Sequence, residues 1–222
     1  MMIKNLVPAL SLLIPAIAQA QPNEPNESNG VDHYVAPVKD AIEISVGTGY
    51  AQGVGKTGGG MADLDKLSGP GGAVQLELGY RVIPHLTIGG YGTLSLHDNG
   101  DAIDDKTDVF GATAGVQAAW HFRPESSFDP FVKLGTGWKG LWLSPDAGKN
   151  TSLQGLELAR LQVGVDYRIT PEVAIAPVVG GSLGMFISQD SPMTADYTEL
   201  DNKEVNFTGF AGIAGTFDIP TR

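Results

Sequence analysis

The most constraining feature of this chain is a series of eight segments in which apolar and polar residues alternate. Alternation with a period of two is typical of a β-strand that has one apolar and one polar face. The connections between segments are in turn long, short, long, short, long, short and long. The sequence therefore predicts an all-β, antiparallel, up-and-down fold with strands at 40–52, 72–82, 86–96, 108–122, 130–142, 156–169, 173–186 and 205–217.

Eight charged residues of these segments have the parity opposite to the apolar residues. In the second segment, for example, Leu76 and Leu78 alternate with Glu77. A basic residue that faces lipid near the bilayer midplane costs about 2–4 kcal/mol, whereas a charge inside a polar lumen avoids that cost. A soluble barrel would have the reverse pattern, with its apolar face inside. The pattern predicts a transmembrane barrel with these charges in its lumen: Glu43, Glu77, Arg81, Lys133, Lys139, Arg160, Asp166 and Arg168.

The connections favour the same topology. Short turns are predicted at 83–85, 123–129 and 170–172, and each of them contains a proline. Longer, polar loops are predicted at 52–71, 97–107, 143–155 and 187–204. Short connections on the periplasmic side and long ones outside are typical of bacterial outer-membrane barrels. Pro177 lies inside the seventh segment and cannot donate a ladder hydrogen bond, so we expect a bulge there or a mistaken strand.

Aromatic residues collect where this topology places the two membrane interfaces, as aromatic girdles do. The predicted periplasmic girdle comprises Tyr80, Trp120, Phe122, Tyr167 and Phe217. The predicted outer girdle comprises Tyr50, Phe110, Trp142 and Phe207.

With these features, the chain resembles the small eight-stranded outer-membrane β-barrels, the OmpA/OmpX-like group of porin-type barrel proteins. The resemblance covers residues 40–217 and includes Gly79-Tyr80-Arg81 before a turn proline and Asp129-Pro130-Phe131 at the start of a strand. It implies a location in a bacterial outer membrane. It also implies outer-membrane lipid, lipopolysaccharide and the barrel assembly machinery as partners.

The first residues have the pattern of an export signal. Lys4 precedes a mostly apolar run at 6–17, and Ala18-Gln19-Ala20 fits the small-x-small cleavage rule. We therefore expect a signal peptide at 1–20, a flexible periplasmic leader at 21–39 and the barrel domain at 40–222.

Composition narrows the classes of partner and cofactor. Asp and Glu number 25 against 14 Lys and Arg, for a net charge of −11, which argues against nucleic acid. The chain has no cysteine, which excludes thiolate metal sites. No cofactor is predicted.

Two interpretations of the lumen stay open. Glu77, Lys133 and Arg160 could form an ion-pair gate across a narrow water path, or the charges could form a static, paired plug. We favour the plug because eight strands leave an interior that side chains just fill.

Acidic outer loops suggest weak cation binding at most. Asp98, Asp101, Asp104 and Asp105 begin like a calcium loop, but Val109 occupies the position of the final acidic ligand. We therefore expect a solvated acidic loop and no metal site. The histidines, including His85 and His121, are scattered and suggest no metal site either.

Three functions remain in order of preference. The first is a structural or interaction protein that contacts surface ligands through its acidic loops and has a largely plugged lumen. The alternative is a narrow porin-like channel for small solutes. The second alternative is an outer-leaflet lipid-modifying enzyme, for which Ser95, His97 and Asp98 are the only suitable group; we predict no enzymatic activity.

Overall fold

The structure is a computed structural model that describes residues 39–104, 106–146, 148, 150–190 and 198–221. The predicted signal peptide and all but the last residue of the predicted leader lie outside these ranges. The elements are β1 (Ala41–Gly55), α1 (Leu64–Leu67), β2 (Ser68–Ile83), β3 (Leu86–Asn99), β4 (Thr107–His121), β5 (Phe128–Pro145), β6 (Thr151–Thr170), β7 (Val173–Asp190), β8 (Thr198–Glu199) and β9 (Val205–Pro220). Among the described residues, no helix is long and apolar enough to cross a membrane.

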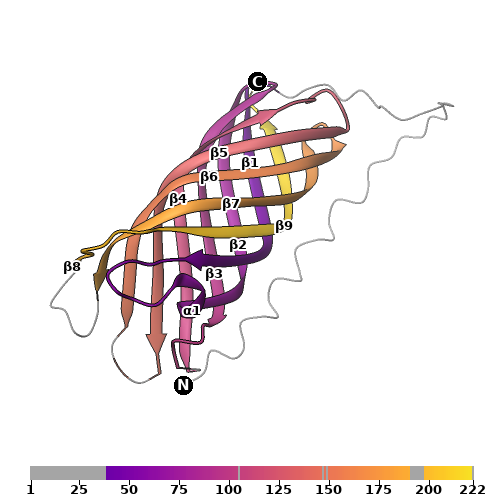
Figure 1. The fold of residues 1–222 in the computed structure, drawn as a ribbon. Coiled ribbons are helices and arrows are strands. Elements are labelled where there is room, and N and C mark those ends of the chain that lie inside the picture. Colours follow the sequence, from indigo (N-terminus) through magenta and orange to yellow (C-terminus); the bar gives the residue numbers. More distant parts are fainter. Residues whose placement is uncertain (1–38, 105, 147, 149, 191–197, 222) are drawn as a thin grey trace. The chain divides into compact units, whose positions relative to one another are not determined.

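The eight long strands form one closed antiparallel barrel (Figure 1). Neighbouring strands follow the order β6-β5-β4-β3-β2-β1-β9-β7, and pairing between β6 and β7 closes the ring. The two-residue strand β8 pairs with β7 near its outer end. The predicted eight-stranded antiparallel barrel is therefore confirmed, with each predicted segment inside one long strand or overlapping it.

The strands are longer than predicted at the end that carries the long loops. Trp142 pairs with Ser152 and Leu143 with Thr151, so most of the predicted loop 143–155 is strand. The connection between β5 and β6 covers only residues 146–150, which is no longer than the opposite turn at 122–127. The prediction of a long third loop was wrong because polar residues such as Ser152 and Gln154 continue the ladder at this end.

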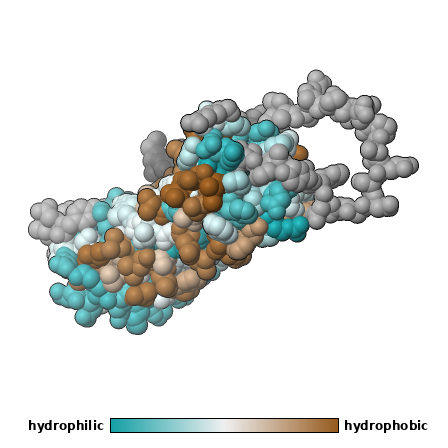
Figure 2. Space-filling model, turned by 90° about the horizontal axis from the view of Figure 1, so that it is seen from above, coloured by the Kyte–Doolittle hydropathy of each residue, from teal (hydrophilic) through white to brown (hydrophobic). Residues whose placement is uncertain are grey.

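The outer wall is apolar and the interior is polar. In β2, Leu76 is 57% exposed on the wall, whereas its neighbour Glu77 is 4% exposed in the lumen. On the face shown in Figure 2, hydrophobic residues form patches along the barrel wall, with hydrophilic residues on either side of them. This distribution is the reverse of that in a water-soluble barrel and suits a wall surrounded by lipid.

A bulge in β6 determines to which side of the barrel wall the Glu157 side chain points. Gly135 pairs with Arg160 but Gly137 pairs with Glu157, so β6 holds one extra residue at this point. The neighbours Leu158 and Ala159 are both exposed, and Glu157 is buried. Strict alternation from Ala159 would have placed this carboxylate on the apolar outer wall. The bulge instead turns it into the lumen.

Pro177 lies inside a continuous β7. It is paired with Ile213 of β9, and the ladder to β6 is interrupted between the pairs Gly164–Val178 and Tyr167–Ile175. No change of register occurs across this gap. The expected bulge at Pro177 is therefore absent, because the missing N–H is accommodated by a local gap in one ladder.

Candidate functional site

A network of buried charges fills the end of the lumen at the short turns, which is called the periplasmic end here after the predicted topology. The Arg81 guanidinium lies 2.6 Å from the Glu43 carboxylate and 3.4 Å from that of Asp218. Arg168 lies 3.0 Å from the same Asp218 carboxylate. These residues come from β1, β2, β6 and β9, so the network joins strands around the barrel. Buried ions of this kind are tolerated only when paired, and here most of them are.

The next layer holds the pair predicted as part of a gate. The Lys133 ammonium forms an ion pair with Glu77, and Gln75 donates a hydrogen bond to the same carboxylate group. The ammonium also lies 4.9 Å from the centroid of the Phe131 ring. Phe131 belongs to a small apolar cluster on the lumen side with Ala176, Val178 and Ala214. Together the pair and the cluster occupy the lumen above the periplasmic network.

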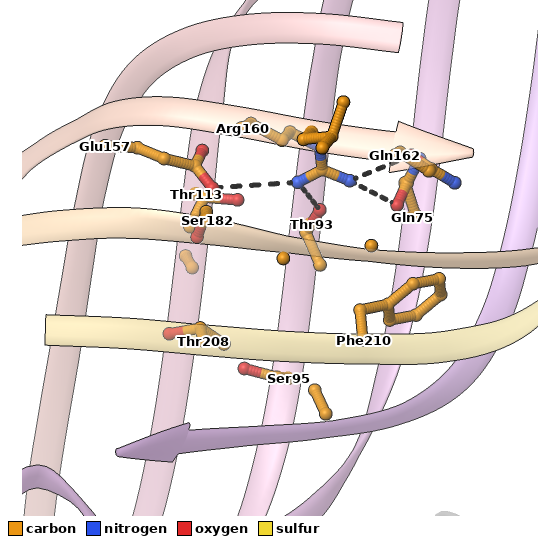
Figure 3. Close-up of a pocket in the computed structure, with 15 residues that line it drawn as sticks. Gln75, Thr93, Ser95, Thr113, Glu157, Arg160, Gln162, Ser182, Thr208 and Phe210 are labelled. Carbon is orange, nitrogen blue, oxygen red and sulfur yellow. Dashed lines mark hydrogen bonds and ion pairs between the residues drawn. The ribbon is translucent and has the colours of Figure 1, made fainter. Parts of the chain in front are cut away.

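A cavity of about 70 Å³ lies farther along the lumen (Figure 3). Arg160 crosses it, donating hydrogen bonds to Gln75 and Thr93, with its guanidinium 3.9 Å from the Glu157 carboxylate. The guanidinium is stacked 4.5 Å from the centroid of the Tyr91 ring, and Tyr91 donates a hydrogen bond to Glu157. Of the three residues grouped in the gate hypothesis, Lys133 therefore pairs with Glu77, whereas Arg160 pairs with Glu157 of its own strand.

A second cavity of about 50 Å³ adjoins the first toward the outer end. The two share the lining residues Ser95, Ala112, Thr113 and Thr208. Lys139 lines the second cavity and donates a hydrogen bond of 2.7 Å to Asn206. The two cavities form a short column, lined in part by polar side chains, that has room for a few water molecules.

Ser95 and His97 meet in this column. The two residues are hydrogen-bonded at 2.8 Å through His97 Nε2, and His97 Nδ1 lies 3.0 Å from the carbonyl oxygen of Gly69. This arrangement suits an imidazole that donates from Nδ1 and accepts from the serine hydroxyl. Asp98 is exposed, on the opposite parity of β3, and so does not join Ser95 and His97 in a triad.

An apolar cluster closes the outer end of the lumen. Leu64 and Leu67 of α1 are buried in it with the strand residues Leu141 and Phe186 and with Leu200 of the last loop. A Cβ added to Gly53 would come within 2.6 Å of Leu64, which shows how tightly the helix packs against β1. The outer mouth is therefore covered by a segment of the first loop.

The outer loops are also bonded to one another. The Gly59 amide donates to the carbonyl oxygen of Asn202, which joins the first loop to the last. The Ala102 amide donates to Lys66, and the Asp146 amide to Lys106, which joins the second loop to its neighbours on both sides. We call this structure, with α1 and the apolar cluster beneath it, the outer cap. Its described residues form one connected surface rather than a set of separate loops.

Acidic residues dominate the described part of the outer cap and the strand ends around it. The acids are Asp63, Asp65, Asp98, Asp101, Asp104, Asp108, Asp146, Asp190, Glu199, Asp201 and Glu204, against Lys56, Lys66, Lys106 and Lys203. The hydrogen bond and charge of Lys203 lower the pKa of Glu199 below its ordinary value. Of the weak calcium candidates, Asp98, Asp101 and Asp104 are exposed, and Asp105 lies outside the described residues.

The predicted aromatic girdles lie on the wall. Tyr80, Trp120, Tyr167 and Phe217 are exposed near one set of strand ends, and Phe122 follows directly after β4. Phe110 and Trp142 pack against each other at 5.5 Å between ring centroids, while Tyr50 and Phe207 are exposed nearer the outer end. Because the strands continue past these outer rings, the barrel projects beyond the outer girdle. Phe128 packs against Tyr167 with 5.1 Å between ring centroids; it joins the periplasmic girdle and was not predicted.

The eight predicted lumen charges are buried or half-buried, and Glu43–Arg81 and Glu77–Lys133 pair among themselves. Other partners were not predicted. Asp218 lies one residue beyond the predicted end of the last strand, Asp129 lies in a predicted turn, and His121 was dismissed as a scattered histidine. Strand parity could have placed His121 and Asp129 in the lumen, but grouping them requires the register of β4 with β5.

Comparison with known proteins supports the fold. Neisserial surface protein A (NspA) is 15% identical, with a TM-score of 0.54 over 79% of this chain and 96% of that one. The outer membrane protein AlkL, solved in lipid bilayers, is 13% identical, with a TM-score of 0.50 over 91% of this chain and 99% of that one. The chain has the fold of the small eight-stranded outer-membrane β-barrels. No family model matches the sequence. No curated protein matches it either.

Proposed function

We propose that this protein is a bacterial outer-membrane barrel that acts as a structural or interaction protein through its acidic outer cap. The observation that supports the proposal most is that packed side chains fill both ends of the described lumen. Buried ion pairs fill the periplasmic end, and the apolar cluster around Leu64 and Phe186 fills the outer end. The two cavities between them are small, at about 70 and 50 Å³. The described part of the outer cap, in contrast, presents exposed acidic residues.

The net negative charge of the outer cap determines which chemical groups it attracts. With acids in excess, the cap attracts cationic groups on a partner, and it attracts divalent ions that bridge it to the phosphates of lipopolysaccharide. Because most of these acids are exposed, the attraction is screened by salt within about 10 Å at an ionic strength of 0.1 M. Binding through the cap is therefore expected to weaken as salt is added.

Two measurements on the full chain refolded in detergent test this proposal. The first is binding of a short fluorescent oligolysine peptide, compared between wild type and Asp101→Asn with Asp104→Asn. The matched control is Glu125→Gln with Glu172→Gln, which removes two acids from the periplasmic turns instead. We expect salt-sensitive binding that falls several-fold in the loop variant alone. Equal loss in both variants, or no binding, would contradict a role for the cap.

The second measurement is single-channel conductance in a planar bilayer. We expect the wild type to be silent after folding has been checked by its altered gel mobility without boiling. The narrow-channel alternative draws support from the two adjoining cavities, which share Ser95 and Thr113 and already form part of a polar path. Steady openings that change with Lys133→Ala would establish that alternative and make the loops secondary.

The lipid-modifying alternative has narrower support. The Ser95–His97 hydrogen bond provides a nucleophile and a base, but the outer cap covers the cavity that they line. Mass spectrometry of outer-leaflet lipid from cells that express wild type or His97→Ala distinguishes a lipid-modifying enzyme from a barrel without this activity. We expect identical lipid profiles, and a product lost in the variant would favour the enzyme.

A further inference from the structure

Two aspartates face each other in the periplasmic half of the lumen. Asp129 of β5 and Asp166 of β6 are direct partners in the antiparallel ladder, and both are buried. Like charges at directly opposed positions of a ladder destabilise it. Burial makes the repulsion stronger because little water screens it. A positive group between the two carboxylates would remove this penalty.

The nearest side chain that can take this place is His121 of β4. Its Nδ1 atom lies 2.8 Å from Asp129 Oδ2 and 3.7 Å from Asp166 Oδ2. His121 also faces Glu43 of β1, with 4.0 Å between Nε2 and the carboxylate. One imidazole is therefore surrounded by carboxylates from three other strands. Among the described residues, His121, Asp129 and Asp166 are the group whose possible metal-binding atoms all lie within 4.8 Å of one another.

Carboxylates outnumber permanent cations on the strands around this group. The strands contribute the carboxylates Glu43, Glu77, Asp129, Asp166 and Asp218 and the permanent cations Arg81, Lys133 and Arg168. A divalent cation bound here would offset this excess of acidic groups.

One buried oxygen of the group also lacks a hydrogen-bond partner. Asp166 Oδ1 is inaccessible to solvent and accepts no hydrogen bond from the described residues. Buried side-chain oxygens and nitrogens without a partner are uncommon, and a bound ion or water is one of the usual reasons. By contrast, Asp129 Oδ1 accepts a hydrogen bond of 2.9 Å from the Arg123 backbone amide, which fixes this carboxylate with its other oxygen toward His121.

We propose that His121, Asp129 and Asp166 bind a divalent transition-metal ion such as Zn²⁺. One imidazole nitrogen with carboxylate oxygens is a donor set that zinc accepts. The nitrogen donor disfavours Ca²⁺ and Mg²⁺, which prefer oxygen ligands. The ion would join β4, β5 and β6 directly above the turn at 122–127. It would thereby hold the periplasmic end of the barrel closed, a role independent of the outer cap.

Zinc binding to the full chain tests the site. The protein is refolded in detergent, stripped with EDTA and titrated with ZnCl₂ by calorimetry, with equilibrium dialysis for stoichiometry. We expect one equivalent of zinc, little competition from Ca²⁺, and affinity reduced at least tenfold in Asp166→Asn and in His121→Gln. Zinc should raise the thermal unfolding temperature of the wild type and of the loop control Asp104→Asn, but not that of the two site variants.

Several outcomes would overturn the site. These are no zinc on folded wild type, unchanged affinity in both folded site variants, or loss of binding in Asp104→Asn. If the site variants do not fold, the site is tested by NMR of the wild type with added paramagnetic Mn²⁺. Selective broadening of the His121 side-chain NMR signals supports the site, and broadening of His97 or His85 instead, or of none, rejects it. The peptide-binding test of the cap is unaffected by either result.

Discussion

Arg81 and Glu43, on neighbouring strands, form a 2.6 Å ion pair in which both side chains are almost fully buried. Asp218 shares the same guanidinium. The free energy of such a pair depends on both members being present. Removing one member leaves the other charged and desolvated, which typically costs about 3–5 kcal/mol.

We therefore predict that Arg81→Ala lowers the free energy of unfolding by about 3–5 kcal/mol. The double variant Arg81→Met with Glu43→Leu should lose less, because no charge of this pair is stranded. Urea unfolding in lipid vesicles measures both. Lys203→Met is the control, since Lys203 and Glu199 form an exposed pair and its loss should change stability little. Equal losses in Arg81→Ala and Lys203→Met would contradict a buried network.

Leu64 provides a test of the outer cap. Leu64→Ser places a hydroxyl in the apolar cluster that closes the outer mouth, so we expect α1 to leave its place against Gly53. The chain has no cysteine, so Ser95→Cys introduces a single thiol beneath the cap. Its rate of reaction with a hydrophilic, membrane-impermeant reagent should rise more than tenfold when Leu64→Ser is added.

The matched control for this experiment is Leu96→Ser, a similar change on the outer wall of β3, where Leu96 is exposed. It should leave the rate of thiol reaction unchanged. A fast reaction in Ser95→Cys alone would show that the cap does not close the lumen.

The sequence allowed the barrel to be predicted because strand alternation and charge parity are local patterns. Leu76 and Glu77 point to opposite sides whatever their partners are, and a lipid-facing wall makes the choice of side costly to reverse. The strand ends were less predictable. Ser152 and Gln154 are polar enough to suggest a loop, yet they continue the ladder because their partners on β5 and β7 do.

The candidate site depends on information that alternation does not contain. The contact between His121 and Asp129 needs the register of β4 with β5, and Glu157 enters the lumen only because of the bulge in β6. The outer cap depends on tertiary packing of Leu64 and Leu200, which lie far apart in the sequence. No pattern within either loop reveals that they meet.

Gly58 tests the contact between the first and last loops. Gly58 and Gly60 both have positive φ, at 86° and 74°, so replacing either with alanine strains the backbone. A Cβ at Gly58 would lie 2.2 Å from the Asn202 carbonyl oxygen, whereas one at Gly60 meets nothing within 4 Å. Gly58→Ala should therefore separate the loops and accelerate cleavage of the cap by an added protease. Gly60→Ala should do so much less, and equal rates would mean that the loops are not held together there.

A substitution at Leu134 tests whether the apolar wall faces lipid. It lies in the middle of β5 and is 61% exposed, so Leu134→Arg puts a cation on the wall. In a membrane barrel this change should cost about 2–4 kcal/mol near the midplane. In a barrel surrounded by water, the same exposed arginine would be well solvated and the cost would be small. Urea unfolding in lipid vesicles, compared with Ala102→Arg in the outer loop, separates the two. A loss confined to Leu134→Arg places the wall in the bilayer, and similar stability in both variants would remove the physical basis for a transmembrane barrel.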